Sequence, residues 1–289
     1  GGMKKAENFV FSVNAGAPVS FETDGQNDLS VAAGTYNVTE PAVSGYATTY
    51  DNCKDIIVPN GGTATCTITN DDIAPKLTLN KSVMNDNGGN ASASDWKLSA
   101  SNSGYSDSFS GQGPTVGPNT ITAGVEYTLE EANGPSGYSA SQWSCDGGTL
   151  TGNILKLGLA DNVSCKITND DQSAKLIVKK IVKNDNGGKL EAKDFSFSVN
   201  SGTAVLFEAD GQNDLTVNAG KYSVTEPAVT GYATSYDNCT DVVIPNGGTA
   251  TCTITTDDIA PKLTLVKHVT NTNGGNAVVS DFPLFIDGA

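Results

Sequence analysis

The sequence predicts an all-β protein made of tandem, Ig-like β-sandwich units. Thr, Ser, Asn, Gly and Val are frequent among the 289 residues, and signals for helices are weak. Clusters of turn residues return about every 8–12 residues, a spacing typical of short strands. Long segments also repeat along the chain, and six cysteines fall at matching positions of the repeat. The composition therefore favours strands, and the repeat divides them into similar units.

The repeat has an offset of 186 residues and contains two kinds of unit. The segment "TDGQNDLSVAAGTYNVTEPAVSGYATTYDNC" at 23–53 returns as "ADGQNDLTVNAGKYSVTEPAVTGYATSYDNC" at 209–239. Between them lies a diverged copy, in which "GVEYTLEEANGPSGY" at 124–138 matches "GTYNVTEPAVSGY". Two units of about 93 residues therefore fill each offset, in the pattern A–B–A followed by the start of another B.

The units follow one another with short linkers. We expect them at 1–72, 76–171 and 175–258, with the opening strands of a fourth, incomplete unit at 262–289. Gly1 aligns with Gly187, so the first unit lacks the opening strand that "KLIVKKIV" supplies to the third unit. The simpler interpretation of the two ends is a window onto a longer tandem array. The alternative is that a terminal strand completes the open unit of a neighbouring molecule.

The cysteines predict one disulfide in each unit. Six cysteines allow many pairings, but tandem copies are expected to pair in the same way. The predicted pairs are Cys53–Cys66, Cys145–Cys165 and Cys239–Cys252. Zinc is not expected, because each thiol pair lacks a neighbouring histidine and His268 is the only histidine. Disulfides indicate an oxidising, extracellular or cell-surface location.

The charge balance is strongly acidic and excludes several classes of partner. Asp and Glu number 32 against 17 Lys and Arg, which gives a formal net charge of −15. Nucleic acids and anionic membranes attract basic patches, so we expect neither as a partner. No apolar run approaches the roughly 18 residues of a membrane-spanning helix. The acidity is typical of an exposed, soluble surface.

Three strands of the second unit each place one polar residue on an otherwise apolar face. These faces are Leu77, Leu79, Lys81 and Val83; Tyr127, Leu129 and Glu131; and Val163, Cys165, Ile167 and Asn169. Burial lowers the pKa of a lysine and raises that of a glutamate, which favours a neutral, nucleophilic amine. A protonated glutamate can polarise an asparagine carboxamide. The three residues together could thus form a Lys–Asn isopeptide bond with loss of ammonia.

The segments "YNVTEPAVSGY", "YTLEEANGPSGY" and "YSVTEPAVTGY" resemble the E-box of Cna B-type, or prealbumin-like, domains. These are β-sandwich units of bacterial surface adhesins and pilins. In that family the first strand supplies a lysine, the E-box a glutamate, and the last strand an asparagine or aspartate. The resemblance extends over nearly the whole chain, unit by unit.

The family pattern is complete in the second unit alone. Lys81 and Asn169 match the bonded pair there, and Glu131 matches the residue that catalyses this self-cross-link. An isopeptide bond, a noncovalent Lys–Glu–Asn cluster and a Lys81 that reaches water at the end of the sheet all remain open. The disulfide on the last strand departs from the commonest family pattern.

Each neighbouring unit lacks one of the three residues. The third unit has Lys180 and Glu226, but Thr256 stands at the acceptor position and has no carbonyl to attack. The first unit has Glu40 and Asn70, but the matching lysine is missing together with the opening strand. Lys267, on the right face of the C-terminal strand, is a candidate from another molecule.

The turns and aromatic residues allow two further hypotheses. Three short segments combine Asp or Asn with Gly: "NDNGG" at 85–89 and 184–188, "NTNGG" at 271–275, and "DGQND" at 24–28 and 210–214. This combination favours turns. We expect no cofactor there, and a weak calcium site is the alternative. Trp96, Tyr105, Tyr138 and Trp143 could line a glycan- or protein-binding face of the second unit, although core packing accounts for them equally well.

The sequence therefore predicts the shaft of an extracellular surface protein or adhesin, with no activity on an external substrate. Its partners are adjacent repeats or neighbouring copies, with a host or cell-surface ligand as a further possibility. One alternative is a filament subunit polymerised by strand complementation. The other is a glycan- or protein-binding module.

Overall fold

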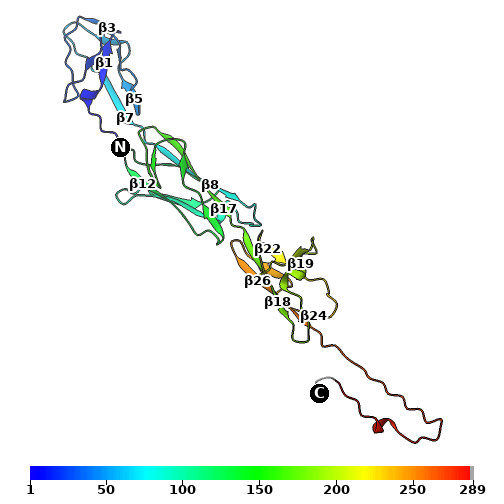
Figure 1. Ribbon diagram of the computed structural model, residues 1–289. Coiled ribbons are helices and arrows are strands. Elements are labelled where there is room, and N and C mark those ends of the chain that lie inside the picture. The colour runs from blue at the N-terminus through cyan, green and yellow to red at the C-terminus, as the bar shows by residue number, and fades with distance from the viewer. Residues whose placement is uncertain (287–289) are drawn as a thin grey trace. The chain divides into compact units, whose positions relative to one another are not determined.

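A computed structural model describes residues 1–286, and strands dominate its three units, from Val10 to Asp258 (Figure 1). The helices of this described range are short 3-10 turns, one near the start of each unit. They are Ala6–Asn8, Ala93–Asp95, Ala192–Asp194 and Val279–Asp281. Each turn is followed directly by an aromatic residue. The 3-10 turns thus occur at equivalent positions of the sequence repeat. The all-β prediction is confirmed.

The second unit is a sandwich of two sheets with the strand orders β10-β9-β12-β16-β15 and β11-β8-β17-β13. Its strands are β8 (Lys76–Met84), β9 (Lys97–Ser101), β10 (Phe109–Gln112), β11 (Thr115–Thr120), β12 (Glu126–Ala132), β13 (Tyr138–Ala140), β14 (Ser144–Cys145), β15 (Thr149–Thr151), β16 (Ile154–Lys156) and β17 (Asn162–Asp171). Leu77 and Leu79 of β8 pack with Leu98, Leu129 and Ile167 in the core between the sheets. The alternation of apolar residues along β8 places one face of the strand in this core.

The first and last strands of the second unit are parallel neighbours. In their register Cys165 lies opposite Leu79, Ile167 opposite Lys81, and Asn169 opposite Val83. The chain thus enters the unit on β8 and leaves it on β17 from the middle of the same sheet. This pairing brings Lys81 and Asn169 close together although 88 positions separate them in the sequence.

The third unit repeats this central arrangement with a sheet ordered β21-β18-β26-β24. Its strands are β18 (Ala174–Lys183), β19 (Ser196–Val199), β20 (Val205–Leu206), β21 (Gln212–Val217), β22 (Gly220–Tyr222), β23 (Val224–Thr225), β24 (Tyr232–Asp237), β25 (Val242–Ile244) and β26 (Thr249–Asp258). Phe195 and Phe197 are almost fully buried beneath this sheet. The first strand again lies beside the last.

The first unit has smaller sheets, with the strand orders β2-β1-β4, β3-β6 and β5-β7. Its strands are β1 (Val10–Val13), β2 (Val19–Ser20), β3 (Gly34–Tyr36), β4 (Val38–Thr39), β5 (Tyr46–Asp51), β6 (Ile56–Val58) and β7 (Thr67–Asp72). Residues 26–31 correspond to β21 of the third unit but are not a strand. In the third unit β21 pairs with β18, whereas no strand within residues 1–286 pairs with residues 26–31.

The opening strands expected within 262–289 do not form in the part that the structure describes. Residues 262–286 contain a single 3-10 turn and no strand. Leu263, Leu265 and Val266 are 70%, 48% and 74% exposed. The prediction of strands was wrong here because the alternating pattern supplies only one face of a strand. A strand also needs a paired neighbour for its backbone groups and a core for its apolar face.

Candidate cross-linking site

The second unit brings Lys81, Glu131 and Asn169 together in its core. Lys81 and Asn169 come from the adjacent strands β8 and β17, and Glu131 reaches across from β12 of the facing sheet. The Lys81 side chain is fully buried and that of Glu131 is 11% exposed, with Lys81 Nζ 3.2 Å from Glu131 Oε2. Asn169 Nδ2 donates a hydrogen bond to Glu131 Oε1 at 2.6 Å. The side chains of Lys81 and Asn169 therefore both contact the carboxylate of Glu131, and the three predicted residues lie together.

The polar atoms of this cluster are incompletely satisfied. Lys81 Nζ donates to the carbonyl oxygen of Ser82 at 2.9 Å, whereas its contact with Glu131 Oε2 is an ion pair without hydrogen-bond geometry. Asn169 Oδ1 is buried and has no hydrogen-bond partner. An unpaired buried carbonyl is costly, and it is also an open acceptor for a proton on Glu131 once the carboxamide rotates.

Burial of the Lys81 ammonium lowers its pKa, and the charge of Glu131 opposes this shift without cancelling it. The aromatic ring of Trp96 covers the ammonium, with Nζ 4.6 Å from the ring centroid. Burial makes the Lys81 ammonium easier to deprotonate than one in water, whereas the ring favours the charged form. A neutral amine is the form of lysine that acts as a nucleophile.

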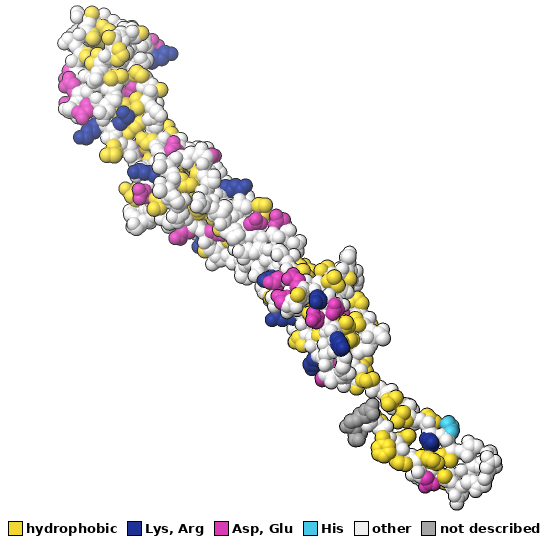
Figure 2. Space-filling model, in the orientation of Figure 1, with side chains coloured by type: hydrophobic (Ala, Val, Ile, Leu, Met, Phe, Trp, Pro, Cys, Tyr) yellow, Lys and Arg dark blue, Asp and Glu magenta, His cyan; other side chains and the backbone are white. Residues whose placement is uncertain are grey.

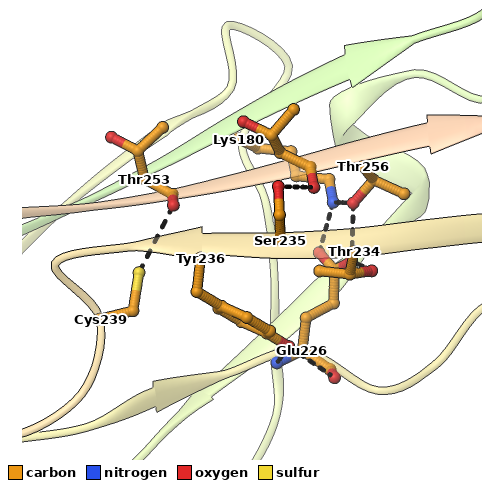
Figure 3. Close-up of polar contacts among 9 residues, drawn as sticks. Lys180, Glu226, Thr234, Ser235, Tyr236, Cys239, Thr253 and Thr256 are labelled. Atoms are coloured by element: carbon orange, nitrogen blue, oxygen red, sulfur yellow. Dashed lines mark hydrogen bonds and ion pairs between the residues drawn. The ribbon is translucent and has the colours of Figure 1, made fainter.

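The third unit has the same lysine and glutamate but a different acceptor (Figure 3). Lys180 Nζ lies 2.5 Å from Glu226 Oε2, and both side chains are almost fully buried. Thr256 stands where the second unit has Asn169. Its hydroxyl accepts a hydrogen bond from Lys180 Nζ and donates one to Glu226 Oε1 at 2.9 Å. The hydroxyl satisfies both partners, so this cluster is a closed noncovalent network with no carbonyl to attack.

The first unit brings together the glutamate and the asparagine of the matching positions. Asn70 Nδ2 donates to Glu40 Oε1, and the Thr48 hydroxyl lies between them, 3.0 Å from Asn70 Nδ2 and 3.4 Å from Glu40 Oε1. Glu40 is 9% exposed, and its Oε2 atom is buried without a hydrogen-bond partner. Within residues 1–286 no ion pair to Glu40 is present. Lys267 contacts an aromatic residue of its own segment, with its Nζ 4.4 Å from the ring centroid of Phe282.

An aromatic partner of the lysine is the element that sequence reasoning missed. Trp96, Phe195 and Phe282 each lie under the lysine of their own segment, at Nζ-to-centroid distances of 4.6, 3.9 and 4.4 Å. Each follows its lysine by 15 positions, a regularity visible in the sequence. Phe9 is the corresponding residue of the first unit.

The four aromatic residues considered for a binding face of the second unit differ in how deeply they are packed. Trp96 is 3% exposed and makes an edge-on contact with Tyr138. Trp143 packs against the core, and Tyr105, at 53%, is the exposed member of the four. Core and hairpin packing therefore accounts for these aromatics.

Each unit also carries one disulfide on its last strand or beside it. The bonds are Cys53–Cys66, Cys145–Cys165 and Cys239–Cys252. Cys165 shares the inner face of β17 with Asn169, four positions away. The disulfide therefore ties the strand that carries the acceptor to the neighbouring segment of the sandwich.

The Asn-Gly turns are anchored by the aspartate that ends each last strand. Asp171 accepts hydrogen bonds from the backbone N–H groups of Asn87 at 2.9 Å and Gly89 at 2.5 Å, and Asp258 plays the same part in the third unit. Burial raises the pKa of Asp171, but these backbone donors outweigh burial and hold the pKa below its usual value. The turns are thus structural.

Calcium at these turns stays a prediction. Each turn gathers three carboxylates whose oxygens lie within 4.8 Å of one another: Asp86, Asp170 and Asp171, and likewise Asp185, Asp257 and Asp258. The backbone donors already occupy the innermost carboxylate of each group.

Comparison with known proteins places the chain in a family. The sequence model of the prealbumin-like fold domain matches residues 1–68, 72–167 and 171–254. The chain belongs to this family. Its three matched segments are consecutive prealbumin-like domains, and each ends two positions before the last-strand residue discussed above, which is Asn70, Asn169 or Thr256. Among curated proteins none matches the chain.

Several solved structures resemble the chain in fold at low sequence identity. The Bacillus anthracis TIE protein is 16% identical over 86% of this chain and 48% of its own, with a TM-score of 0.46, so the chain spans about half of that protein. Two B repeat units of the collagen binding protein of Staphylococcus aureus are 14% identical over 87% and 69%, with a TM-score of 0.25. The minor pilin GBS52 of Streptococcus agalactiae is 12% identical over 68% and 100%, with a TM-score of 0.28.

Proposed function

We propose that the chain is a shaft segment of an extracellular surface protein, and that an isopeptide bond between Lys81 and Asn169 locks its second unit. The single observation that carries this proposal is the meeting of Lys81, Glu131 and Asn169 in the core between the first and last strands. The three consecutive prealbumin-like domains and their disulfides support a structural role outside the cell.

The reaction needs only groups of the chain. The Lys81 ammonium gives a proton to Glu131, and the neutral amine attacks Cγ of Asn169. A bond forms between Lys81 Nζ and Asn169 Cγ, the bond between Cγ and Nδ2 breaks, and the nitrogen leaves as ammonia with the protons that Glu131 returns. Glu131 is unchanged at the end, so the chain modifies itself once.

The mechanical consequence follows from the strand order. In a tandem chain, tension enters the second unit on β8 and leaves it on β17, which are parallel neighbours. A covalent bond between these two strands carries the tension directly and shields residues 82–168. Such a unit can transmit force without unfolding, as a shaft requires.

The surface is compatible with an exposed, soluble shaft. On the face drawn in Figure 2, Lys side chains are scattered singly among Asp and Glu side chains. No helix of the described residues is long and apolar enough to cross a membrane.

Intact mass spectrometry of the full chain tests the proposal. After reduction of the disulfides we expect a mass one ammonia below the sequence mass, and before reduction a mass lower still by two hydrogens for each of the three disulfides. We also expect a linked peptide containing Lys81 and Asn169. Lys81→Arg and Asn169→Ala should each restore the full mass of the second unit. Lys180→Arg is the matched control and should leave the ammonia loss unchanged. An unmodified wild-type mass would refute the bond.

A further inference from the structure

One position beside the cross-linking cluster differs between the units. It lies on the strand that pairs with the last strand, directly across from the acceptor position: Thr48 faces Asn70, Ala140 faces Asn169, and Thr234 faces Thr256. Residues that face each other across an antiparallel pair place their side chains on the same face of the sheet. This position is therefore the neighbour of the acceptor side chain in all three units, and it is an alanine in the second.

The threonine at this position contacts the glutamate of its own unit. In the third unit the Thr234 hydroxyl donates a hydrogen bond to Glu226 Oε1 at 3.2 Å (Figure 3). In the first unit the Thr48 hydroxyl donates to Glu40 Oε1 at 3.4 Å and accepts a hydrogen bond from Asn70 Nδ2 at 3.0 Å. The hydroxyl thus binds the carboxylate, and it also binds the carboxamide nitrogen where an asparagine is the acceptor.

Alanine makes neither contact in the second unit. Asn169 Nδ2 donates to Glu131 Oε1 at 2.6 Å, whereas Glu131 Oε2 and Asn169 Oδ1 are buried without a hydrogen-bond partner. The carboxamide must rotate before Oδ1 can accept a proton from Glu131, and this rotation breaks the hydrogen bond of Nδ2. A threonine at position 140 would hold Nδ2 by a second hydrogen bond, which the rotation would also have to break.

The same hydroxyl would oppose the proton transfer. A hydrogen bond donated to a carboxylate stabilises its charged form. In the proposed reaction Glu131 accepts a proton from Lys81 before the amine attacks, so a further donor to the carboxylate works against this step. The effects on rotation and on protonation therefore have the same direction.

The place of Ala140 in the fold allows a larger side chain. Ala140 is the last residue of β13, the strand at one end of the order β11-β8-β17-β13, and it is exposed. A β-branched residue there gains its extra atoms at the edge of the sheet instead of displacing core side chains. The absence of a hydroxyl is thus a property of the sequence at this position and is not imposed by lack of space.

We propose that Ala140 determines the rate of cross-linking in the second unit, because it leaves Glu131 and Asn169 without a competing hydroxyl. A threonine at this position holds the glutamate and the acceptor in an unreactive arrangement. This inference rests on the Lys81–Asn169 bond of the proposed function and adds what controls its formation. Ala140 takes no part in the bond changes, so it is a positioning residue that acts through its two neighbours.

The test follows the bond in time after a short pulse of cell-free synthesis of the full chain under oxidising conditions. Samples are denatured at intervals, reduced and digested, and mass spectrometry measures the fraction of Asn169 in the linked Lys81–Asn169 peptide. Ala140→Thr should slow the linkage about tenfold, the size expected for one hydrogen bond that must break first. Ala140→Val is the matched control, because it has the shape of threonine without the hydroxyl, and it should react at the wild-type rate.

The third unit provides the reciprocal test. Thr256→Asn supplies an acceptor there, while Thr234 still donates to Glu226. Adding Thr234→Val removes the hydroxyl and keeps the shape of the side chain. We expect the double variant to link Lys180 to position 256 about tenfold faster than Thr256→Asn alone. A threonine that only packs the sheet would give no such gain in rate.

Three outcomes would overturn the inference and leave the Lys81–Asn169 bond in place. They are an Ala140→Thr chain that reacts as fast as wild type, an Ala140→Val chain that is as slow as Ala140→Thr, and a third unit that gains nothing from Thr234→Val. The second of these would assign the effect to size instead of the hydroxyl. A wild-type chain that never yields the linked peptide refutes the proposed function itself, and this inference falls with it.

Discussion

At the scale of single residues, the acceptor beside each buried lysine decides the chemistry. Lys81 and Lys180 occupy equivalent strands, are both buried, and both pair with a glutamate. Asn169 offers a carboxamide whose nitrogen can leave as ammonia, whereas Thr256 offers a hydroxyl that has no comparable leaving group. The same pocket therefore holds the residues of the proposed cross-link in one unit and a hydrogen-bond network in the other.

Replacing Thr256 by asparagine should install a cross-link in the third unit. Lys180 already contacts the side chain at this position, and Glu226 is in place to move the protons. We expect Thr256→Asn to lose one further ammonia and the third unit to gain roughly 4 kcal/mol, as closure of a long loop predicts. Intact mass and thermal unfolding measure the two effects.

The control for this change is Thr256→Ser, which keeps a hydroxyl and should lose no ammonia. An asparagine variant that is folded and keeps its full mass would show that the lysine, glutamate and acceptor alone do not suffice.

The lowered pKa of Lys180 predicts a pH dependence of stability. Burial lowers the pKa of this ammonium from 10.5, and hydrogen bonding and ion pairing with Glu226 oppose the shift in part. Between the folded and unfolded pKa values the native state binds fewer protons than the unfolded state, so stability rises with pH in that window and levels off above 10.5. Lys180→Met should remove this rise relative to wild type, as thermal unfolding at a series of pH values would show.

Lys189→Met, at an exposed position of the same unit, should leave the pH dependence as it is in wild type. An equal rise in the Lys180→Met chain would mean that other groups titrate in this window.

At the scale of elements, the sequence predicted strand faces better than strand partners. The alternation along 76–84 and 162–171 fixed which residues of β8 and β17 point inward, and the repeat indicated equivalent disulfides. The same alternation at 262–270 led to a wrong strand, because period-2 patterning describes one face and says nothing of a neighbour.

The aromatic residue below each lysine shows a different limit. Trp96 was considered for a binding face because aromatic residues serve both cores and ligand sites. Its recurrence at 15 positions after each lysine was the available signal. Only the structure, however, shows that the chain turns back after the 3-10 turn and brings the ring to the ammonium.

The anchoring of the Asn-Gly turns predicts an acid-sensitive element. Burial raises the pKa of Asp171, and the backbone donors of Asn87 and Gly89 lower it further than burial raises it, so the folded pKa lies below 3.8. The stability that this carboxylate contributes is present above pH 3.8 and is lost as the pH falls through the folded pKa. We expect Asp171→Asn to lower the unfolding temperature of the second unit at neutral pH and to reduce the difference from wild type in acid.

Asp86→Asn is the matched control, because Asp86 belongs to the same cluster but does not accept from these backbone groups. A variant at Asp171 that unfolds like wild type at neutral pH would contradict the anchoring role. Calcium titration of the same variants would test the ion-binding hypothesis.

At the scale of the whole molecule, the units differ in how they should respond to tension. In the third unit the load crosses from β18 to β26 through hydrogen bonds and packing, and the disulfide Cys239–Cys252 protects a short loop. In the second unit the bond between Lys81 and Asn169 would carry the load between the terminal strands. With the proposed bond, a single chain would combine an extensible unit with a locked one.

Force spectroscopy of the full chain should resolve this difference. With the disulfides intact, wild type should show no extension step from the second unit, whereas Lys81→Arg should add one. The step releases the 88 positions between residues 81 and 169, less the 20 positions that Cys145–Cys165 closes. At about 3.5 Å per residue, the added length is on the order of 200 Å. Under reducing conditions the Lys81→Arg step should lengthen further by the released loop, while wild type still shows none. Lys180→Arg is the control and should add no step in the second unit. A wild-type chain that extends like Lys81→Arg would show that noncovalent contacts alone hold the second unit.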